Sequence, residues 1–161
     1  LRSLFKKSKS VKHRLRAMWA LFSIGGMDQS WLLQQLNDEN EHVRVWAIKL
    51  LTDNGTVPDK ALVRFESLAD TDSSGLVQLH LASTLRLLPF SKRWDLAGLL
   101  ASKDTFANDP VLPLMIWYGI SPAVGEDRSA AIRFISKCKI PKLRTFTARR
   151  LISNTRTNKE K

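Results

Sequence analysis

The chain has 161 residues, 43% of them hydrophobic, and a formal net charge of +11. This length suits one compact domain or a short repeat array, which buries roughly 70% of the surface that the unfolded chain exposes. The single cysteine excludes an internal disulfide and a cluster of thiolate metal ligands. No apolar run approaches the roughly 18 residues that a membrane-spanning helix needs.

Positive charge is concentrated at the two ends of the sequence. Residues 1–16 carry seven Lys and Arg and no acid, and residues 139–161 carry eight Lys and Arg and one Glu. A protein that binds nucleic acid usually shows a continuous basic face. The uneven distribution therefore weakens a nucleic-acid interpretation of the net charge.

Helical periodicity runs along almost the whole chain, and turn signals interrupt it about every 15 residues. In chain order these signals are Gly25-Gly26, 37–40, Asn54-Gly55, 70–75, Pro89, Asp109-Pro110, Ser121-Pro122 and Pro141. Each can end or begin a helix, as a C-terminal glycine, an Asp, Asn or Ser N-cap, or a proline in the first turn. The sequence therefore predicts a succession of short helices.

The predicted helices alternate between a first and a second member of a pair. Second helices are predicted at 13–21, 43–51, 77–85, 112–120 and 143–151, first helices at 31–36, 61–69, 93–101 and 130–135, and the remnant of an earlier first helix at 1–9. One such pair cannot bury its apolar face alone, whereas stacked pairs share a continuous core. We therefore predict an all-α fold, a right-handed α-solenoid of about four to five HEAT-like antiparallel helix pairs.

We expect this array to form a single domain, 1–161. The repeats are predicted at roughly 1–25, 28–54, 58–89, 92–121 and 126–154, followed by a disordered basic tail at 155–161. Because the pattern is already under way at Leu1, we also expect the chain to be a fragment of a longer protein.

Sequence motifs of catalysis and metal binding are missing. The chain has no glycine-rich phosphate loop, HExxH pair, GxSxG elbow or CxxCH site. His13, His42 and His80 favour exposed or capping positions near the starts of second helices, because a metal site would need a carboxylate or thiolate at i+3 or i+4. Acidic residues in the turns are typical of helix N-caps and dipole partners.

Cys138 is the remaining candidate nucleophile. Lys137 and Lys139 flank it, and their charge would lower the pKa of its thiol. A nucleophile also needs a positioned base, and no histidine is near in the sequence. We therefore predict no catalytic residue, no cofactor-binding residue, no metal ligand and no enzymatic activity in this chain.

The five tryptophans are interpreted as core residues, because each lies at helical spacing among Leu, Ile and Ala. A cleft for stacking bases is the competing interpretation. Trp117 and Tyr118 are an exception, since adjacent residues of a helix cannot face the same way. Phosphate contacts are conceivable at the basic ends, from Lys6, Lys7, Lys9, Lys12, Arg14, Arg16, Lys142, Arg144, Arg149 and Arg150.

Four segments carry a resemblance to a known family: EHVRVWAIKLL (41–51), LVQLHLASTLRLLP (76–89), LPLMIWYGISPAV (112–124) and KIPKLRTFTARRL (139–151). They resemble the HEAT-repeat segment of the large multidomain membrane-bound or haem-binding dehydrogenase-like proteins of planctomycetes and verrucomicrobia. In HEAT repeats an Asp at the position of Asp38 commonly pairs with the Arg of an adjacent turn, which is a structural contact.

The resemblance implies a parent with a sugar-dehydrogenase-like β-propeller, these repeats and a cytochrome c domain, exported to the periplasm or cell surface. This chain has neither CxxCH nor a propeller motif, so any haem and redox chemistry would lie outside it.

The leading functional hypothesis is a scaffold that contacts the flanking domains of the parent or another protein through its second helices. The candidate partner-binding residues are exposed positions of those helices, namely Arg44, Lys49, Gln78, Arg86 and Arg149. The alternative is a nucleic-acid-binding HEAT-like module that uses the basic terminal helices. It is similar in principle to the helical-repeat DNA glycosylases, whose catalytic Asp has its nearest counterpart in Asp109, although an N-cap suits that residue better.

Overall fold

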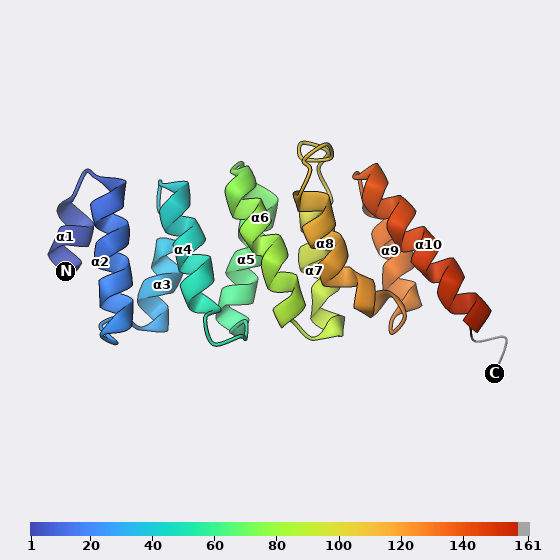
Figure 1. Cartoon of the computed structure of the whole chain (residues 1–161), viewed down its shortest axis with the longest axis horizontal. Helices are drawn as coiled ribbons and strands as arrows, with labels where there is room; N and C mark the ends of the chain where they lie inside the picture. The colour runs from blue at the N-terminus through green and yellow to red at the C-terminus, as the bar shows by residue number, and fades with distance from the viewer. Residues whose placement is uncertain (158–161) are drawn as a thin grey trace. The chain divides into compact units, whose positions relative to one another are not determined.

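The computed structural model describes residues 1–157, with side chains placed through Ser153. Within these residues the chain forms ten α-helices, three short 3-10 helices and no strand (Figure 1). The all-α class predicted from the sequence is confirmed. None of the helices in this part of the chain combines the length and hydropathy that crossing a bilayer requires.

The chain divides into two compact units where the sequence analysis expected a single domain. The N-terminal unit is Leu1–Arg64 and the C-terminal unit is Phe65–Lys161, so the boundary falls inside α5 (Asp59–Thr71). Each unit has buried apolar residues of its own, such as Met18 and Ile48 in the first and Leu81 and Ile116 in the second.

The N-terminal unit contains α1 (Arg2–Lys7), α2 (Val11–Ser23), α3 (Gln29–Gln35) and α4 (Glu41–Leu51). Here α2 packs against α1 and α4, and α3 packs against α4. Side-chain caps begin two of these helices, since Asp28 accepts a hydrogen bond from the Trp31 amide and Asn40 from the His42 amide. Gly25, with a φ of 66°, supplies the left-handed turn after α2.

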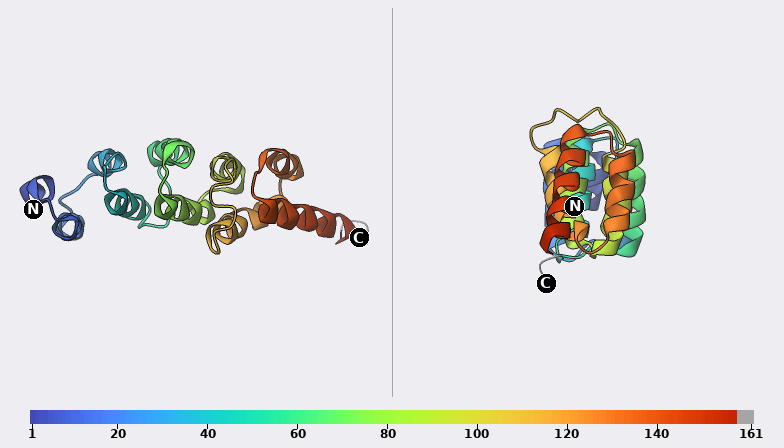
Figure 2. Two further views of the ribbon diagram at one scale, coloured as in Figure 1. Left: turned by 90° about the horizontal axis from the view of Figure 1, so that it is seen from above. Right: turned by 90° about the vertical axis from the view of Figure 1, so that its right-hand side faces the viewer.

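The C-terminal unit contains α6 (Gly75–Thr84), α7 (Arg93–Leu100), α8 (Leu112–Ile120), α9 (Arg128–Lys137) and α10 (Pro141–Thr157), with 3-10 helices η1 (Leu85–Leu87), η2 (Phe90–Lys92) and η3 (Ser121–Val124). Within it, α6, α8 and α10 lie side by side in one layer, and α7 and α9 form the other (Figure 2). Ser74 and Asp127 cap α6 and α9 by accepting hydrogen bonds from the Val77 and Ala130 amides.

Each predicted helical segment falls on one helix of the structure, and 1–9 contains α1. The predicted second helices lie on α2, α4, α6 with the start of η1, α8 and α10, and the predicted first helices lie on α3, α5, α7 and α9. The structure describes α10 as far as Thr157, three residues into the segment 155–161 for which a disordered tail is predicted. Leu143, Thr147 and Leu151 are buried one turn apart, and this buried stripe carries the helix toward its end. Residues 158–161 lie outside the described part of the chain.

Candidate binding surface

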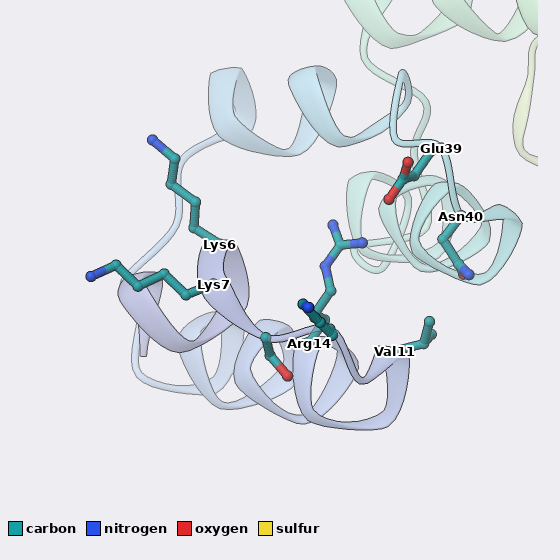
Figure 3. Close-up of a pocket in the computed structure, with 8 residues that line it drawn as sticks. Lys6, Lys7, Val11, Arg14, Glu39 and Asn40 are labelled. Atoms are coloured by element: carbon teal, nitrogen blue, oxygen red, sulfur yellow. The ribbon is translucent and has the colours of Figure 1, made fainter.

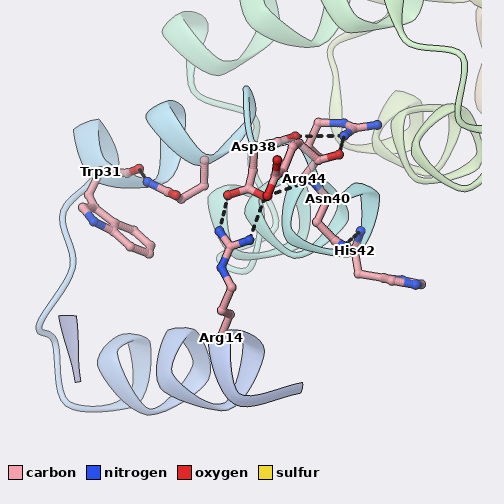
Figure 4. A network of polar contacts seen from close by, with 8 residues as sticks. Arg14, Trp31, Asp38, Asn40, His42 and Arg44 are labelled. Carbon is pink, nitrogen blue, oxygen red and sulfur yellow. Dashed lines mark hydrogen bonds and ion pairs between the residues drawn. The ribbon is translucent and has the colours of Figure 1, made fainter. Parts of the chain in front are cut away.

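An ion pair holds the turn between α3 and α4 against α2 (Figure 4). The guanidinium of Arg14 is bidentate to Asp38, with Nη1 donating to Oδ1 at 3.2 Å and Nη2 donating to Oδ2. The two side chains are 15% and 10% exposed. Oδ1 of Asp38 also accepts a hydrogen bond from the Asn40 amide at 3.0 Å, so this carboxylate organises the turn as well as the ion pair.

Asp38 therefore pairs with Arg14 of an earlier helix, and Arg44 has a different role. Nη1 of Arg44 donates to the main-chain oxygens of Asp38 at 2.8 Å and Glu39 at 3.0 Å. Arg44 is half-buried and is engaged in holding its own turn. It is consequently a weaker candidate for partner contact than the sequence suggested.

A cavity of about 580 Å³ lies beside this network, between α1, the start of α2 and the loop that precedes α4. Lys6, Lys7 and Lys9 line it, together with Glu39 and Arg14. Lys6 and Lys7 extend away from Glu39 and do not converge with Arg14 (Figure 3). Because Asp38 already neutralises Arg14, this cavity is a loose basic rim and does not form a convergent anion site.

The N-terminal unit also presents aromatic and cationic side chains together on α2 and α4. The rings of Trp19 and Trp46 meet edge to face, with centroids 4.7 Å apart and an interplanar angle of 63°. Nζ of Lys49 lies 4.1 Å from the centroid of the Trp46 ring. Arg16 is exposed one turn before Trp19, which is itself 37% exposed. We call these four residues the aromatic–cationic surface.

The core interpretation of the tryptophans is correct for Trp94, which is buried, and needs correction elsewhere. Trp31, Trp46 and Trp117 are half-buried and Trp19 is exposed, because an indole at the flank of a helix contact covers a neighbour with one side only. Helical spacing cannot distinguish such a flank from the core. The prediction that Trp117 and its neighbour face differently is confirmed, since Tyr118 is exposed.

The prediction that Gln78 is an exposed contact residue is wrong. Gln78 is 4% exposed, and its Nε2 donates to the main-chain oxygens of Leu68 at 3.3 Å, Ala69 at 3.3 Å and Asp72 at 2.7 Å. It therefore binds main-chain oxygens at the end of α5 and just after it, and is not available to a partner.

The remaining predicted contacts are exposed. Lys49 lies on α4, Arg86 on η1 and Arg149 on α10. Lys49 alone among them has a described aromatic neighbour, the ring of Trp46. The aromatic–cationic surface thus contains one of the predicted residues and two tryptophans that sequence reasoning assigned to the core.

Arg93 is a structural residue that the sequence analysis missed. It is 8% exposed, and its guanidinium donates to the main-chain oxygens of Leu88 at 2.8 Å, Gly119 at 2.6 Å and Arg86 at 3.1 Å. Burial lowers the pKa of Arg93 from its ordinary value, yet three carbonyl partners and the ring of Phe90 favour the charged form. An arginine at the start of a helix gives no signal of burial in the sequence.

The candidate chemical groups behave as structural residues. Burial raises the pKa of the Cys138 thiol, and this outweighs the lowering effects of its hydrogen bond to Ile140 and of the Arg144 charge, so the lowered pKa expected from the flanking lysines is wrong. Asp109 accepts hydrogen bonds from the Leu112 and Val111 amides, which lower its pKa, and so it holds the turn that leads into α8, although the N-cap position of that helix is Val111. His13 and His42 are exposed and His80 is half-buried, and no cluster of three potential ligands that could hold a metal occurs among the described residues.

Comparison of the chain with protein-family models, curated proteins and solved structures gives no significant match.

Proposed function

We propose that this chain is a non-catalytic scaffold, a right-handed HEAT-like α-solenoid whose second helices bind a protein partner. The observation that supports the proposal is the aromatic–cationic surface of α2 and α4, where Trp19 is exposed while its ring rests on Trp46. Tryptophan and arginine are enriched among the residues that dominate protein interfaces. A ring already held by a neighbour also loses little conformational freedom on binding.

The chemistry of this surface defines the kind of partner. Lys49 and Arg16 add positive charge beside two apolar rings, so the complementary segment carries acidic and apolar side chains. The resemblance to HEAT segments of exported dehydrogenase- or cytochrome-like proteins implies that such a segment would belong to a flanking domain of a longer parent protein or to another protein.

The test is binding of a fluorescent peptide that alternates Glu with Leu and Phe, measured by anisotropy. Trp19→Ala removes the exposed ring and is expected to weaken binding about tenfold or more, as truncation of a central aromatic anchor does. Val63→Ala is the matched control, because Val63 is also an exposed apolar residue of the N-terminal unit but lies on a first helix, α5. Equal affinities for the two variants would contradict the proposal.

A nucleic-acid-binding module is the second candidate, favoured by the lysines at the rim of the α1–α2 cavity. Random-sequence duplex DNA titrated at about 50 and 200 mM salt tests it, because phosphate contacts release counterions and make affinity fall steeply with salt. Tight binding with that steep loss, weakened by Lys6→Gln and Lys7→Gln but not by Trp19→Ala, would support the nucleic-acid module over the protein scaffold.

A further inference from the structure

A second concave site lies in the C-terminal unit, on first helices. It is a groove of about 480 Å³ bordered by α7, α9 and the part of α5 that follows Phe65. Its volume is within the range of ordinary ligand sites, and it is lined by apolar as well as charged side chains.

Two aromatic side chains contribute apolar surface to this groove. Trp94 and Phe134 are both buried, and their ring centroids lie 5.9 Å apart. Gly98 leaves the space beside them open, because a Cβ at this position would have no neighbour within 4 Å. Nε1 of Trp94 is buried and has no hydrogen-bond acceptor in the described structure. The groove therefore offers room for an apolar group where a larger residue on α7 would have filled it.

Two carboxylates from different helices also line the groove. Glu66 comes from α5 and Asp95 from the first turn of α7. Among the described residues neither carboxylate forms an ion pair. Burial, and after it the negative charge of Asp95, raise the pKa of Glu66.

Arg133 and Lys137 of α9 supply the opposite charge in the same groove. Both are exposed, one turn apart on the helix. The groove thus combines acidic side chains from α5 and α7, an apolar region and basic side chains from α9. A ligand that complements it carries a cation, an apolar group and an anion within one short stretch.

We propose that this groove docks a peptide segment of a partner protein that presents a lysine or arginine to Glu66 and Asp95 and an apolar side chain to Trp94 and Phe134. An acidic residue of the same segment meets Arg133 and Lys137. The alkyl stem of a lysine or arginine covers apolar surface while its charged end reaches a carboxylate. The inference shares with the proposed function that the partner is a protein, but it concerns a different surface, which carries acidic as well as basic side chains.

The probe is an acetylated and amidated peptide containing Lys, Leu, Phe and Glu, titrated against the ¹⁵N-labelled chain. The indole N–H signal of Trp94, assigned with Trp94→Phe, reports occupancy of the groove. Glu66→Gln is expected to weaken the peptide about tenfold, as loss of one partly desolvated charge pair does. Glu126→Gln is the matched control, because Glu126 is an exposed carboxylate of the same unit outside the groove. A peptide with glutamine in place of lysine should bind equally weakly to the wild-type chain and to Glu66→Gln.

Gly98→Leu provides a variant that fills the groove without disturbing the fold, since the added side chain begins in open space. It is expected to abolish the Trp94 shift. Retention of the lysine peptide by Gly98→Leu, or equal losses in Glu66→Gln and Glu126→Gln, would overturn the proposal. If the lysine peptide failed to bind at millimolar concentration while the acidic peptide still depended on Trp19, the groove proposal would fail and the proposed function would stand.

Discussion

Each unit of this chain contains an arginine that binds another helix or turn of the same unit, and the two arginines have different kinds of partner. In the N-terminal unit Arg14 pairs with a carboxylate, Asp38, at a site that keeps some contact with water. In the C-terminal unit Arg93 binds three main-chain oxygens, including that of Gly119 near the end of α8. The C-terminus of a helix carries partial negative charge and unsatisfied carbonyls. These carbonyls can therefore take the place of a carboxylate as partners of a buried guanidinium. The comparison indicates that the C-terminal unit depends more on its arginine.

Close helix packing shows a parallel difference. In the N-terminal unit Ala17 and Ala47, both fully buried, lie on the adjacent helices α2 and α4. In the C-terminal unit α8 approaches η1 at Gly119, where a Cβ would lie 2.5 Å from the Cβ of Leu85. The N-terminal unit thus accommodates buried methyl groups on its packed helices, whereas the contact of α8 with η1 excludes one at Gly119.

The largest effect is expected from Arg93→Met, which keeps an aliphatic stem and removes the donors. Buried carbonyls left without a donor each cost about 1–3 kcal/mol, so we expect a loss of about 3–5 kcal/mol in the free energy of unfolding. Urea denaturation followed by circular dichroism measures it. A loss below about 1 kcal/mol would show that water satisfies these carbonyls and that the two arginines are equivalent in importance.

The next effect is that of Gly119→Ala, because the added methyl group cannot fit against Leu85 without a shift of α8. Overpacking of this kind costs about 1–3 kcal/mol. Gly98→Ala on α7 is the matched control, since its Cβ meets nothing within 4 Å and alanine favours the helix by about 0.5–1 kcal/mol. Opposite signs for the two alanines support close approach at Gly119, whereas two stabilised variants would argue against it.

The helices could be predicted from the sequence because their limits are set locally. Ser74 and Asp127 are each followed three residues later by the amide that they cap, and Gly25 supplies its own left-handed conformation. Each of these signals acts within about one helical turn of the chain. None of them depends on tertiary packing, so all of them can be recognised in the sequence.

The roles of single polar and aromatic residues could not be predicted in the same way. The buried guanidinium of Arg93 donates to main-chain oxygens, one of which belongs to Gly119, far away in the sequence. The buried amide of Gln78 donates to a main-chain oxygen that follows the preceding helix. A periodic pattern assigns both to solvent because it does not count main-chain acceptors from other elements. Trp19 shows the converse, since a pattern assigns a large apolar residue to the core although it lies at the flank of a contact.

A smaller effect is expected at Arg14, and a double-mutant cycle with Arg14→Gln and Asp38→Asn isolates it. Asparagine keeps an acceptor for the Asn40 amide, so the cycle reports the ion pair alone. We expect a coupling of about 1 kcal/mol that declines as salt is added, because the pair is only partly shielded from water. A coupling as large as the loss at Arg93, and indifferent to salt, would remove the contrast between the two units.

The smallest effect concerns the pH dependence of the free energy of unfolding, to which one carboxylate in each unit contributes with opposite sign. Because the folded-state pKa of Glu66 is raised, the folded chain holds this proton more tightly than the unfolded chain, and stability falls as pH rises from the ordinary value of 4.5 through the raised value. Glu66→Gln should remove that slope and stabilise the chain at neutral pH, by less than about 0.5 kcal/mol because solvent screens the side chain.

In the N-terminal unit the pKa of Asp28 is lowered, chiefly by its hydrogen bond from the Trp31 amide. The contribution of Asp28 to stability is therefore present above the ordinary value of 3.8 and is lost as pH falls through the lowered value. Asp28→Asn should therefore change the slope in the opposite direction. Urea titrations of both variants between about pH 3 and pH 7 measure the two slopes, and equal signs would show that the pKa of Glu66 is not raised in the folded chain.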